Sequence, residues 1–365
     1  MPAPRSGTVL RGLAILWIGL LAGFAIGIEW IRGHPDAPPP SGGIDLVGAG
    51  ATFPYPLYRR WFADYGASSG VRINYFSVGS SEGIRLLLAD SVDFGATDRP
   101  LSPDERSRAR CGAIEIPMVI GAVAVTYNVP GLSAPLRLDA DVIAAIFLGR
   151  ITSWNAPPLR ALNPGVALPA LTILPVHRAR RTGTSTVFEK YLASAPAWRA
   201  ARSAASGLTA AGSRVEGNEG VTAEVQVHAG AIGIVELTYA TQSRLPVAML
   251  KNAAGAFILP STASTARAAE ELLTPAASDT LTGVIGATTP DAYPVVALTR
   301  IVVDGALGDP QRTGHFIAFA RWALTEGARS AADVAYAPLP EGVAAHQMRR
   351  LNALRNNTCA APVTP

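Results

Sequence analysis

Short apolar segments alternate with amphipathic segments along the chain from residue 44 onward. Short apolar runs indicate buried strands, and apolar positions spaced three and four residues apart indicate helices. Strands are predicted at 44–47, 71–76, 92–94, 114–127, 171–177, 232–235 and 295–303. Helices are predicted at 54–65, 81–89, 103–110, 140–148, 184–192, 313–326 and 343–355. This alternation predicts an α/β architecture of packed layers.

The N-terminus has the pattern of a membrane-targeting segment. Arg5 and Arg11 precede an uncharged apolar run, and positive charge before such a run places the N-terminus in the cytoplasm and the rest of the chain outside. Ala25-Ile26-Gly27 is only a weak candidate for the small-x-small site that cleavage needs, so for residues 1–32 we favour a retained signal-anchor helix over a cleaved signal peptide. Residues 12–31 would then tether the protein to the inner membrane. The Pro- and Gly-rich residues 33–43 predict a linker.

Composition and charge exclude several classes of function. The formal net charge is +4 without the clustered basic face of a nucleic-acid binder, so no nucleic acid is expected as a partner. Cys111 and Cys359 lie far apart, so a thiol metal site is not predicted. In an oxidising compartment they form one disulfide or remain two thiols, and their spacing does not decide between these. The histidines lack metal-ligand spacing, and no metal or cofactor is predicted.

Three turns, each joining a predicted strand to a predicted helix, share one design. Each places helix-start N–H groups beside short hydroxyls, and the third adds a guanidinium, which together suit an oxyanion. A single Ser or Thr in such a turn is also what a helix N-cap requires, so the repetition carries the argument. The turns comprise residues 48–54, 79–81 and 178–184. No Gly-Lys-Ser/Thr follows the first turn, which disfavours a nucleotide loop.

Eight stretches, taken in order, carry a resemblance to a known family. They are GAGATFPYPLYRRWF (48–62), YFSVGSSEGI (75–84), VDFGATDRPLS (92–102), PMVIGAVAVTYNVPGL (117–132), IFLGRITSWNAPPLRALNPG (146–165), HRARRTGTSTVFEKYL (177–192), GNEGV (217–221) and AGAIGIVELTYA (229–240). Through them the sequence resembles the phosphate-binding protein of the phosphate-specific ABC importer, from about residue 46 to residue 350.

The resemblance implies a two-lobe periplasmic-binding-protein (Venus-flytrap) fold with two hinge-crossing strands. Lobe I would comprise residues 44–127 and 296–365, and lobe II residues 128–295, with the crossings near Asn128 and Val296. By motif match, the phosphate contacts would be Thr52, Phe53, Ser80, Asp98, Arg178, Thr182, Gly183 and Thr184. Both lobes then contribute, so a ligand that bridges them closes the cleft.

Asp98 is an acid in an expected anion site, and it has a physical role there. Phosphate at neutral pH keeps a P–O–H donor that a carboxylate can accept, whereas sulfate carries no proton. Asp98 would therefore select protonated oxyanions.

Two positions depart from the family pattern. Arg180, followed by Arg181, stands where an acid usually holds the binding arginine, and Glu82 stands where glycine is usual. Arg178 therefore lacks its expected partner. Either Glu82 faces Arg180 or Arg181 across the closed cleft, or these side chains are solvated.

The resemblance implies a monomeric extracytoplasmic or periplasmic protein that captures inorganic phosphate and delivers it to ABC permease subunits with their ATPase. Alternatives are another protonated oxyanion such as arsenate, or a membrane-tethered phosphate sensor or scavenger. A phosphatase is disfavoured, because the sequence offers neither an evident nucleophile–base pair nor a metal cluster.

Overall fold

The computed structural model describes residues 45–110, 112–132, 134–179, 182–203, 212–305 and 309–354. Several predictions concern residues outside these ranges: the N-terminal apolar helix, the linker, the Cys111–Cys359 pairing, and the contacts of Arg180 and Arg181. They stay predictions. Within the described ranges, no helix is both long and apolar enough to cross a membrane.

The strands form one large sheet and one small sheet. The large sheet has the order β2-β1-β3-β12-β4-β8-β6-β7, with β11 paired to β12 and β13 paired to β4, and the small one has the order β10-β9-β5. The strands are β1 (Asp45–Gly50), β2 (Arg72–Ser77), β3 (Phe94–Thr97), β4 (Ala113–Tyr127), β5 (Arg137–Leu138), β6 (Leu174–Arg178), β7 (Ser213–Val215), β8 (Ala231–Glu236), β9 (Met249–Lys251), β10 (Phe257–Ile258), β11 (Gly283–Ile285), β12 (Val295–Asp304) and β13 (Tyr336–Ala337).

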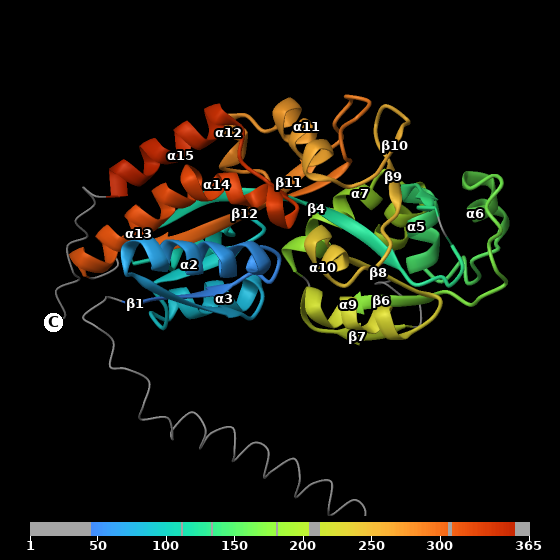
Figure 1. Ribbon diagram of the computed structural model, residues 1–365, viewed down its shortest axis with the longest axis horizontal. Coiled ribbons are helices and arrows are strands. Elements are labelled where there is room, and N and C mark those ends of the chain that lie inside the picture. The colour runs from blue at the N-terminus through green and yellow to red at the C-terminus, as the bar shows by residue number, and fades with distance from the viewer. Residues whose placement is uncertain are drawn as a thin grey trace, which may run out of the picture. The chain divides into compact units, whose positions relative to one another are not determined.

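Helices connect and cover these strands (Figure 1). They are α2 (Tyr55–Ser69), α3 (Ser80–Leu88), α4 (Pro103–Ser107), α5 (Ala140–Phe147), α6 (Pro157–Leu162), α7 (Gly183–Leu192), α8 (Pro196–Ser203), α9 (Gly217–Val227), α10 (Leu237–Gln242), α11 (Thr262–Leu272), α12 (Pro275–Ser278), α13 (Pro310–Leu324), α14 (Glu326–Ala331) and α15 (Glu341–Leu354), with a 3-10 turn at Ala332–Val334. Each strand and helix predicted within the described ranges has an observed counterpart. The prediction missed the short strands β5, β7, β9, β10, β11 and β13 and the helices α6, α8, α9, α10, α11, α12 and α14.

An aromatic core packs α2 against the sheet and α13. The apolar positions of α2 fall on one face of the helix, and Tyr58, Trp61 and Phe62 are buried there. Phe62 lies 5.3 Å, ring centroid to centroid, from Phe319 of α13 and 6.3 Å from Phe94 of β3. This packing holds the first turn of α2 at the edge of the sheet, next to the ends of β1 and β3.

β4 is a single strand that belongs to both halves of the large sheet. Its residues up to Ala122 pair with β12, and its residues from Val123 to Tyr127 pair with β8. We call β2, β1, β3, β12 and the first part of β4 the first half, and the rest of β4, β8, β6 and β7 the second half (Figure 1). One continuous backbone therefore fixes the position of each half at this junction.

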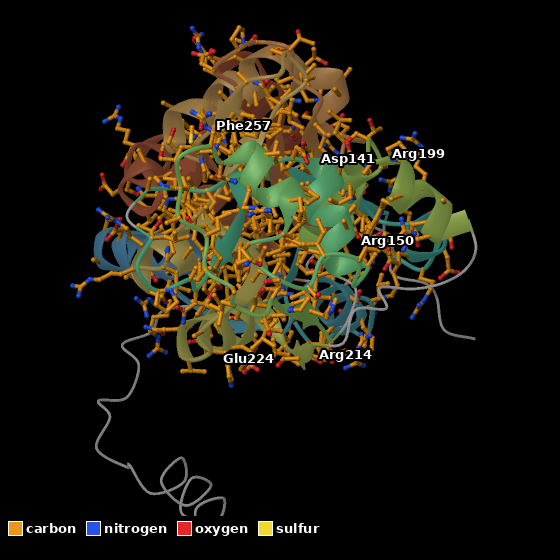
Figure 2. All side chains as sticks on the ribbon, turned by 90° about the vertical axis from the view of Figure 1, so that its right-hand side faces the viewer. Asp141, Arg150, Arg199, Arg214, Glu224 and Phe257 are labelled. Carbon is orange, nitrogen blue, oxygen red and sulfur yellow. The ribbon has the colours of Figure 1, made fainter. Side chains whose placement is uncertain are left out.

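The second half also carries the small sheet, and its surface bears both positive and negative side chains. The guanidinium carbon of Arg137 lies 5.8 Å from the ring centroid of Phe257, which joins β5 to β10. Charged residues of both signs spread over this face, as Figure 2 shows for Asp141, Arg150, Arg199, Arg214 and Glu224.

Glu236, at the end of β8, joins the two halves through a buried hydrogen-bond network. The Tyr336 hydroxyl lies 2.9 Å from Glu236 Oε2 and 2.5 Å from the carbonyl oxygen of Phe53. The hydroxyl carries one proton, which these two acceptor oxygens share. Burial raises the pKa of Glu236 to about 8, against hydrogen bonds from Thr238 and Tyr336 that lower it.

The network makes stability depend on pH. A carboxyl group with a raised pKa holds its proton in the folded protein and releases it on unfolding, so its stabilising contribution is present below about pH 4.5 and is lost as the pH rises through about 8. We expect Glu236→Gln, which stays neutral, to flatten the decline of the melting temperature between pH 6 and about pH 9. Thermal unfolding followed by circular dichroism measures it.

Buried Asp98, whose pKa is raised to about 7, contributes to the same decline at lower pH, so Glu236→Gln should remove chiefly the upper part. The exposed Glu341→Gln is the matched control and should leave the profile unchanged. An unchanged profile for Glu236→Gln would show that Glu236 is already ionised in the folded protein.

Candidate functional site

The predicted site residues lie at the carboxyl ends of parallel strands. β1 pairs in parallel with β2 and β3, and β6 pairs in parallel with β7 and β8. Thr52, Ser80 and Asp98 follow β1, β2 and β3, and Arg178 ends β6. Open α/β sheets bind ligands at this edge, because helix N-termini and loops converge there.

The first turn is held by groups from the second half of the sheet. Thr52 Oγ1 accepts hydrogen bonds from Asn218 Nδ2 at 3.0 Å and from Arg178 Nη2 at 3.4 Å. The Thr52 carbonyl oxygen accepts a hydrogen bond from the Tyr239 hydroxyl at 2.6 Å. The Phe53 side chain is fully buried against Tyr336. Thr52 is thus a junction between the halves rather than an N-cap of α2, which starts without a side-chain cap.

Asp98 is buried where β3, β12 and two helix starts meet. It is 2% exposed, its backbone N–H lies 3.4 Å from Ser80 Oγ, and its Oδ1 accepts a hydrogen bond from Thr299 at 2.9 Å. Burial raises its pKa to about 7, and the Thr299 hydrogen bond and the charges of Arg178 and Arg300 oppose the rise. Asp98 therefore holds its proton to a higher pH than an exposed aspartate does.

The third turn brings the start of α7 directly against Asp98. A Cβ atom placed on Gly183 would lie 2.2 Å from Asp98 Cβ, so no other residue fits without displacing the backbone. Thr182 caps α7 by accepting a hydrogen bond from the Ser185 N–H at 3.2 Å. Thr184 is 1% exposed, and its Oγ1 has no hydrogen-bond partner among the residues that the structure describes.

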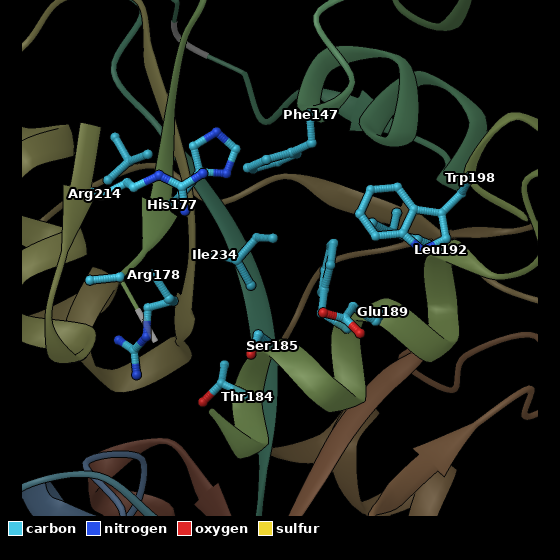
Figure 3. Close-up of a pocket in the computed structure, with 13 residues that line it drawn as sticks. Phe147, His177, Arg178, Thr184, Ser185, Glu189, Leu192, Trp198, Arg214 and Ile234 are labelled. Atoms are coloured by element: carbon cyan, nitrogen blue, oxygen red, sulfur yellow. The ribbon is translucent and has the colours of Figure 1, made fainter. Parts of the chain in front are cut away.

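Arg178 provides the positive charge of the site. Burial lowers its pKa, and the carboxylates of Glu219 and Asp98 act in the opposite direction. Its Nε and Nη1 are buried, and the described part of the chain supplies no hydrogen-bond acceptor for either. In Figure 3 its guanidinium and the Thr184 hydroxyl both point away from Trp198. Buried donors of this kind suit a ligand with several acceptor oxygens.

Figure 3 shows a cavity of about 210 Å³ beside β6, lined largely by apolar side chains. Phe147 packs edge-on against His177 at its wall, with ring centroids 5.5 Å apart. Phe188 and Trp198 line it from α7 and α8. Arg178 and Thr184 line this cavity too, but no residue of the first half of the sheet does, whereas residues of both halves line the cleft between the halves.

A cavity of about 430 Å³ lies in this cleft. Thr52, Ser80 and Ser81 line it from the first half, and Arg178 and Thr182 line it from the second. Three glutamates also line it, namely Glu82, Glu216 and Glu219. In the part of the chain that the structure covers, no three His, Cys, Asp or Glu side chains form a group that could hold a metal ion.

Glu82 has a partner within its own helix. Its carboxylate accepts hydrogen bonds from Arg85 Nε at 2.9 Å and Nη2 at 2.6 Å. Contacts with Arg180 or Arg181 concern residues that are not described, so the compensation hypothesis stays a prediction.

Sequence reasoning missed four residues of this site. Asn218, Tyr239 and Glu219 lie in stretches that carry the family resemblance, at 217–221 and 229–240, and that was the only signal available. Thr299 is the one hydroxyl residue in β12, a strand that is apolar apart from Thr299, Arg300 and the terminal Asp304, and its sequence context gives no sign of a contact with Asp98.

Comparisons with known proteins agree with this geometry. The model of the PBP superfamily domain matches residues 36–326. The phosphate-binding protein PstS of Xylella fastidiosa is 36% identical over 302 residues, covering 81% of this chain and 82% of the relative. The PstS of Haemophilus influenzae is 34% identical over 303 residues, covering 82% and 90%.

A solved structure bears on the fold. It is that of a high affinity periplasmic phosphate-binding protein (PfluDING) bound with phosphate at pH 8.5, with a TM-score of 0.67 and 22% identity, covering 83% of this chain and 92% of that one. It confirms the predicted two-lobe α/β binding-protein fold. The family match over most of the chain and the identity to these relatives lead to one conclusion: the chain belongs to the phosphate-binding protein (PstS) family of the PBP superfamily.

Proposed function

We propose that this protein captures inorganic phosphate in the cleft between its lobes and delivers it to an ABC permease with its associated ATPase. The observation that carries the proposal is the burial of Asp98 beside Gly183, near enough to Arg178 that each charge shifts the pKa of the other group. A cation beside a proton acceptor suits an oxyanion that keeps a proton. The names of the relatives, phosphate-binding protein PstS, support the same ligand.

Capture follows from the distribution of these groups. Thr52, Ser80 and Asp98 come from the first half of the sheet, and the donors of Arg178 and the α7 turn come from the second. A ligand that accepts hydrogen bonds from both halves binds the closed arrangement more tightly than the open one. It therefore shifts the equilibrium toward the closed arrangement. In this scheme the chain acts as a monomer. It binds and releases phosphate without changing it chemically, so it is not an enzyme.

The same scheme sets the lobe boundaries. Lobe I comprises residues 44–127 and 296–365, and lobe II residues 128–295. The change of partner along β4, from β12 to β8 at Val123, supports a hinge in this strand. The pairing of β11 with the first residues of β12 supports a second crossing near Val296.

Protonation of Asp98 should change which anions bind. Above pH 7 the carboxylate accepts the proton of phosphate and repels sulfate, whereas below pH 7 the neutral group can donate to a bare oxygen. We expect the affinity for sulfate to rise as the pH falls from 8 to 5, and the preference for phosphate to decline. Calorimetric titrations with phosphate, arsenate and sulfate at both pH values measure this.

Asp98→Asn should discriminate poorly at both pH values, because an amide donates as well as accepts. Exposed Asp64→Asn is the matched control and should behave as the unaltered protein. A sulfate affinity independent of pH in the unaltered protein would contradict the assigned role of Asp98.

Removal of the guanidinium should weaken all oxyanions alike. Arg178→Ala is expected to cost roughly 2–5 kcal/mol in binding free energy, the range for deleting one partner of a buried charge pair. Arg59→Ala, on the exposed side of α2, is the control and should bind normally. If a folded Arg178→Ala protein bound oxyanions normally, the binding site would have to lie elsewhere in the protein.

We also propose that residues 12–31 hold the protein at the outer face of the inner membrane. Intact protein should stay with membranes after an alkaline carbonate wash, and its N-terminal peptide should still contain Arg11. A soluble mature form that begins near residue 28 would replace the anchor by a cleaved signal and would leave phosphate binding unaffected.

A further inference from the structure

Thr299 lies at an irregularity in the hinge strand β12. It pairs with Val119, whereas the next residue, Arg300, pairs with Pro117, so Met118 of β4 is an extra residue opposite them. Pro117 has no backbone N–H to donate, and prolines in sheets occur at such bulges. The bulge is therefore a consequence of the sequence, and it lies next to the site.

The Thr299 hydroxyl donates a hydrogen bond to the buried carboxyl group of Asp98. Thr299 is fully buried, and its Oγ1 donates to Asp98 Oδ1 at 2.9 Å. A hydrogen bond from a fixed hydroxyl to a carboxylate restricts rotation of the carboxylate and occupies one of its oxygens.

The other oxygen of Asp98 faces the proposed ligand side. A Cβ atom placed on Gly183 would lie 2.9 Å from Asp98 Oδ2, so this oxygen lies at the first turn of α7. Thr182 and Thr184 flank Gly183 in that turn. The two oxygens of the carboxylate thus have different environments, one bonded within the protein and one at the anion site.

We propose that Thr299 is a positioning residue that sets the anion specificity of Asp98, by holding Oδ1 and directing Oδ2 to accept the proton of the ligand. The proposal deepens the proposed function and rests on it for the identity of the ligand. Thr299 itself does not touch the ligand in this scheme.

The electrostatic surroundings of Asp98 give the direction of the effect. Burial raises the pKa of Asp98, while the Thr299 hydrogen bond and two arginines lower it. The charged and titratable groups that interact with it are Arg178, Arg300, Tyr58, Tyr75 and Glu236. Loss of the hydroxyl therefore raises the pKa of Asp98 further, so that more of it is neutral at pH 7 and able to donate to sulfate.

Thr299→Val, a close match in shape, tests the proposal, with Thr299→Ser as the variant that keeps the hydroxyl. The ratio of phosphate to sulfate affinity at pH 7 should fall roughly tenfold to a hundredfold in Thr299→Val, the range for one hydrogen bond to a charged group. Thr299→Ser should retain the ratio. In an Asp98→Asn background, Thr299→Val should have little further effect on the ratio, because the two residues act as one unit.

A second measurement needs no ligand. Carbon-13 NMR of the Asp98 carboxyl carbon, assigned by its absence in Asp98→Asn, should show titration at higher pH in Thr299→Val than in Thr299→Ser. A merely structural role would lower the melting temperature and leave this titration unchanged, which would overturn the proposal. Failure of the unaltered protein to bind phosphate would contradict the proposed function alone, since the titration remains measurable.

Discussion

Two opposite charges, Asp98 and Arg178, are buried at the edge where the halves of the sheet meet, and each is costly to remove from water. Much of the surrounding structure reduces that cost. Parallel strands direct their carboxyl ends toward the pair, and Thr299 and Thr52 supply hydroxyls to it. The donors on Arg178 and Thr184 that find no partner among the described residues are those that an oxyanion would use. The fold and the proposed ligand thus both compensate the cost of burying Asp98 and Arg178.

The hydrogen bonds that join the halves also couple the site to the rest of the molecule. Tyr239 and Tyr336, from different segments, donate to the backbone carbonyl oxygens of Thr52 and Phe53. Glu236 adds a buried proton next to Tyr336. The first turn is therefore fixed by residues distant in sequence, and its geometry does not depend on the cap of its own helix.

Much of the fold followed from the hydrophobic pattern, because long strands such as β4 and β12 are largely apolar and helices such as α2 have a clear apolar face. The helix predicted at 103–110 starts at Pro103, where Ser102 and Glu105 each bond to the backbone of the other. Two- or three-residue strands such as β5 and β13 carry too few positions for a periodic signal, and pairing with distant segments decides them. They were missed for that reason.

The sequence predicted a site residue only where a charged or hydroxyl side chain lies in a turn that leads into a helix. Arg178 and Ser80 stand in turns with a helix start, so their positions in the sequence indicate their surroundings. Strand pairing and packing bring Thr299, Asn218 and Tyr239 to partners more than a hundred residues away in the chain. Asn218 and Thr52, for example, are 166 residues apart. The hydrophobic pattern and the local turns give no sign of such contacts, and only the family resemblance drew attention to the stretches that contain Asn218 and Tyr239.

The bulge at Met118 imposes a limit on how this family can change length. β4 pairs with β12 on both sides of the bulge and with β8 from Val123 onward, so the number of residues between Met118 and Val123 must fit two partner strands at once. One residue more or fewer there would turn the side chains of one half to the opposite face. Substitutions are tolerable in this stretch if they stay apolar, but insertions and deletions should be confined to surface loops. We therefore expect the length of this short segment to vary less among relatives than its composition.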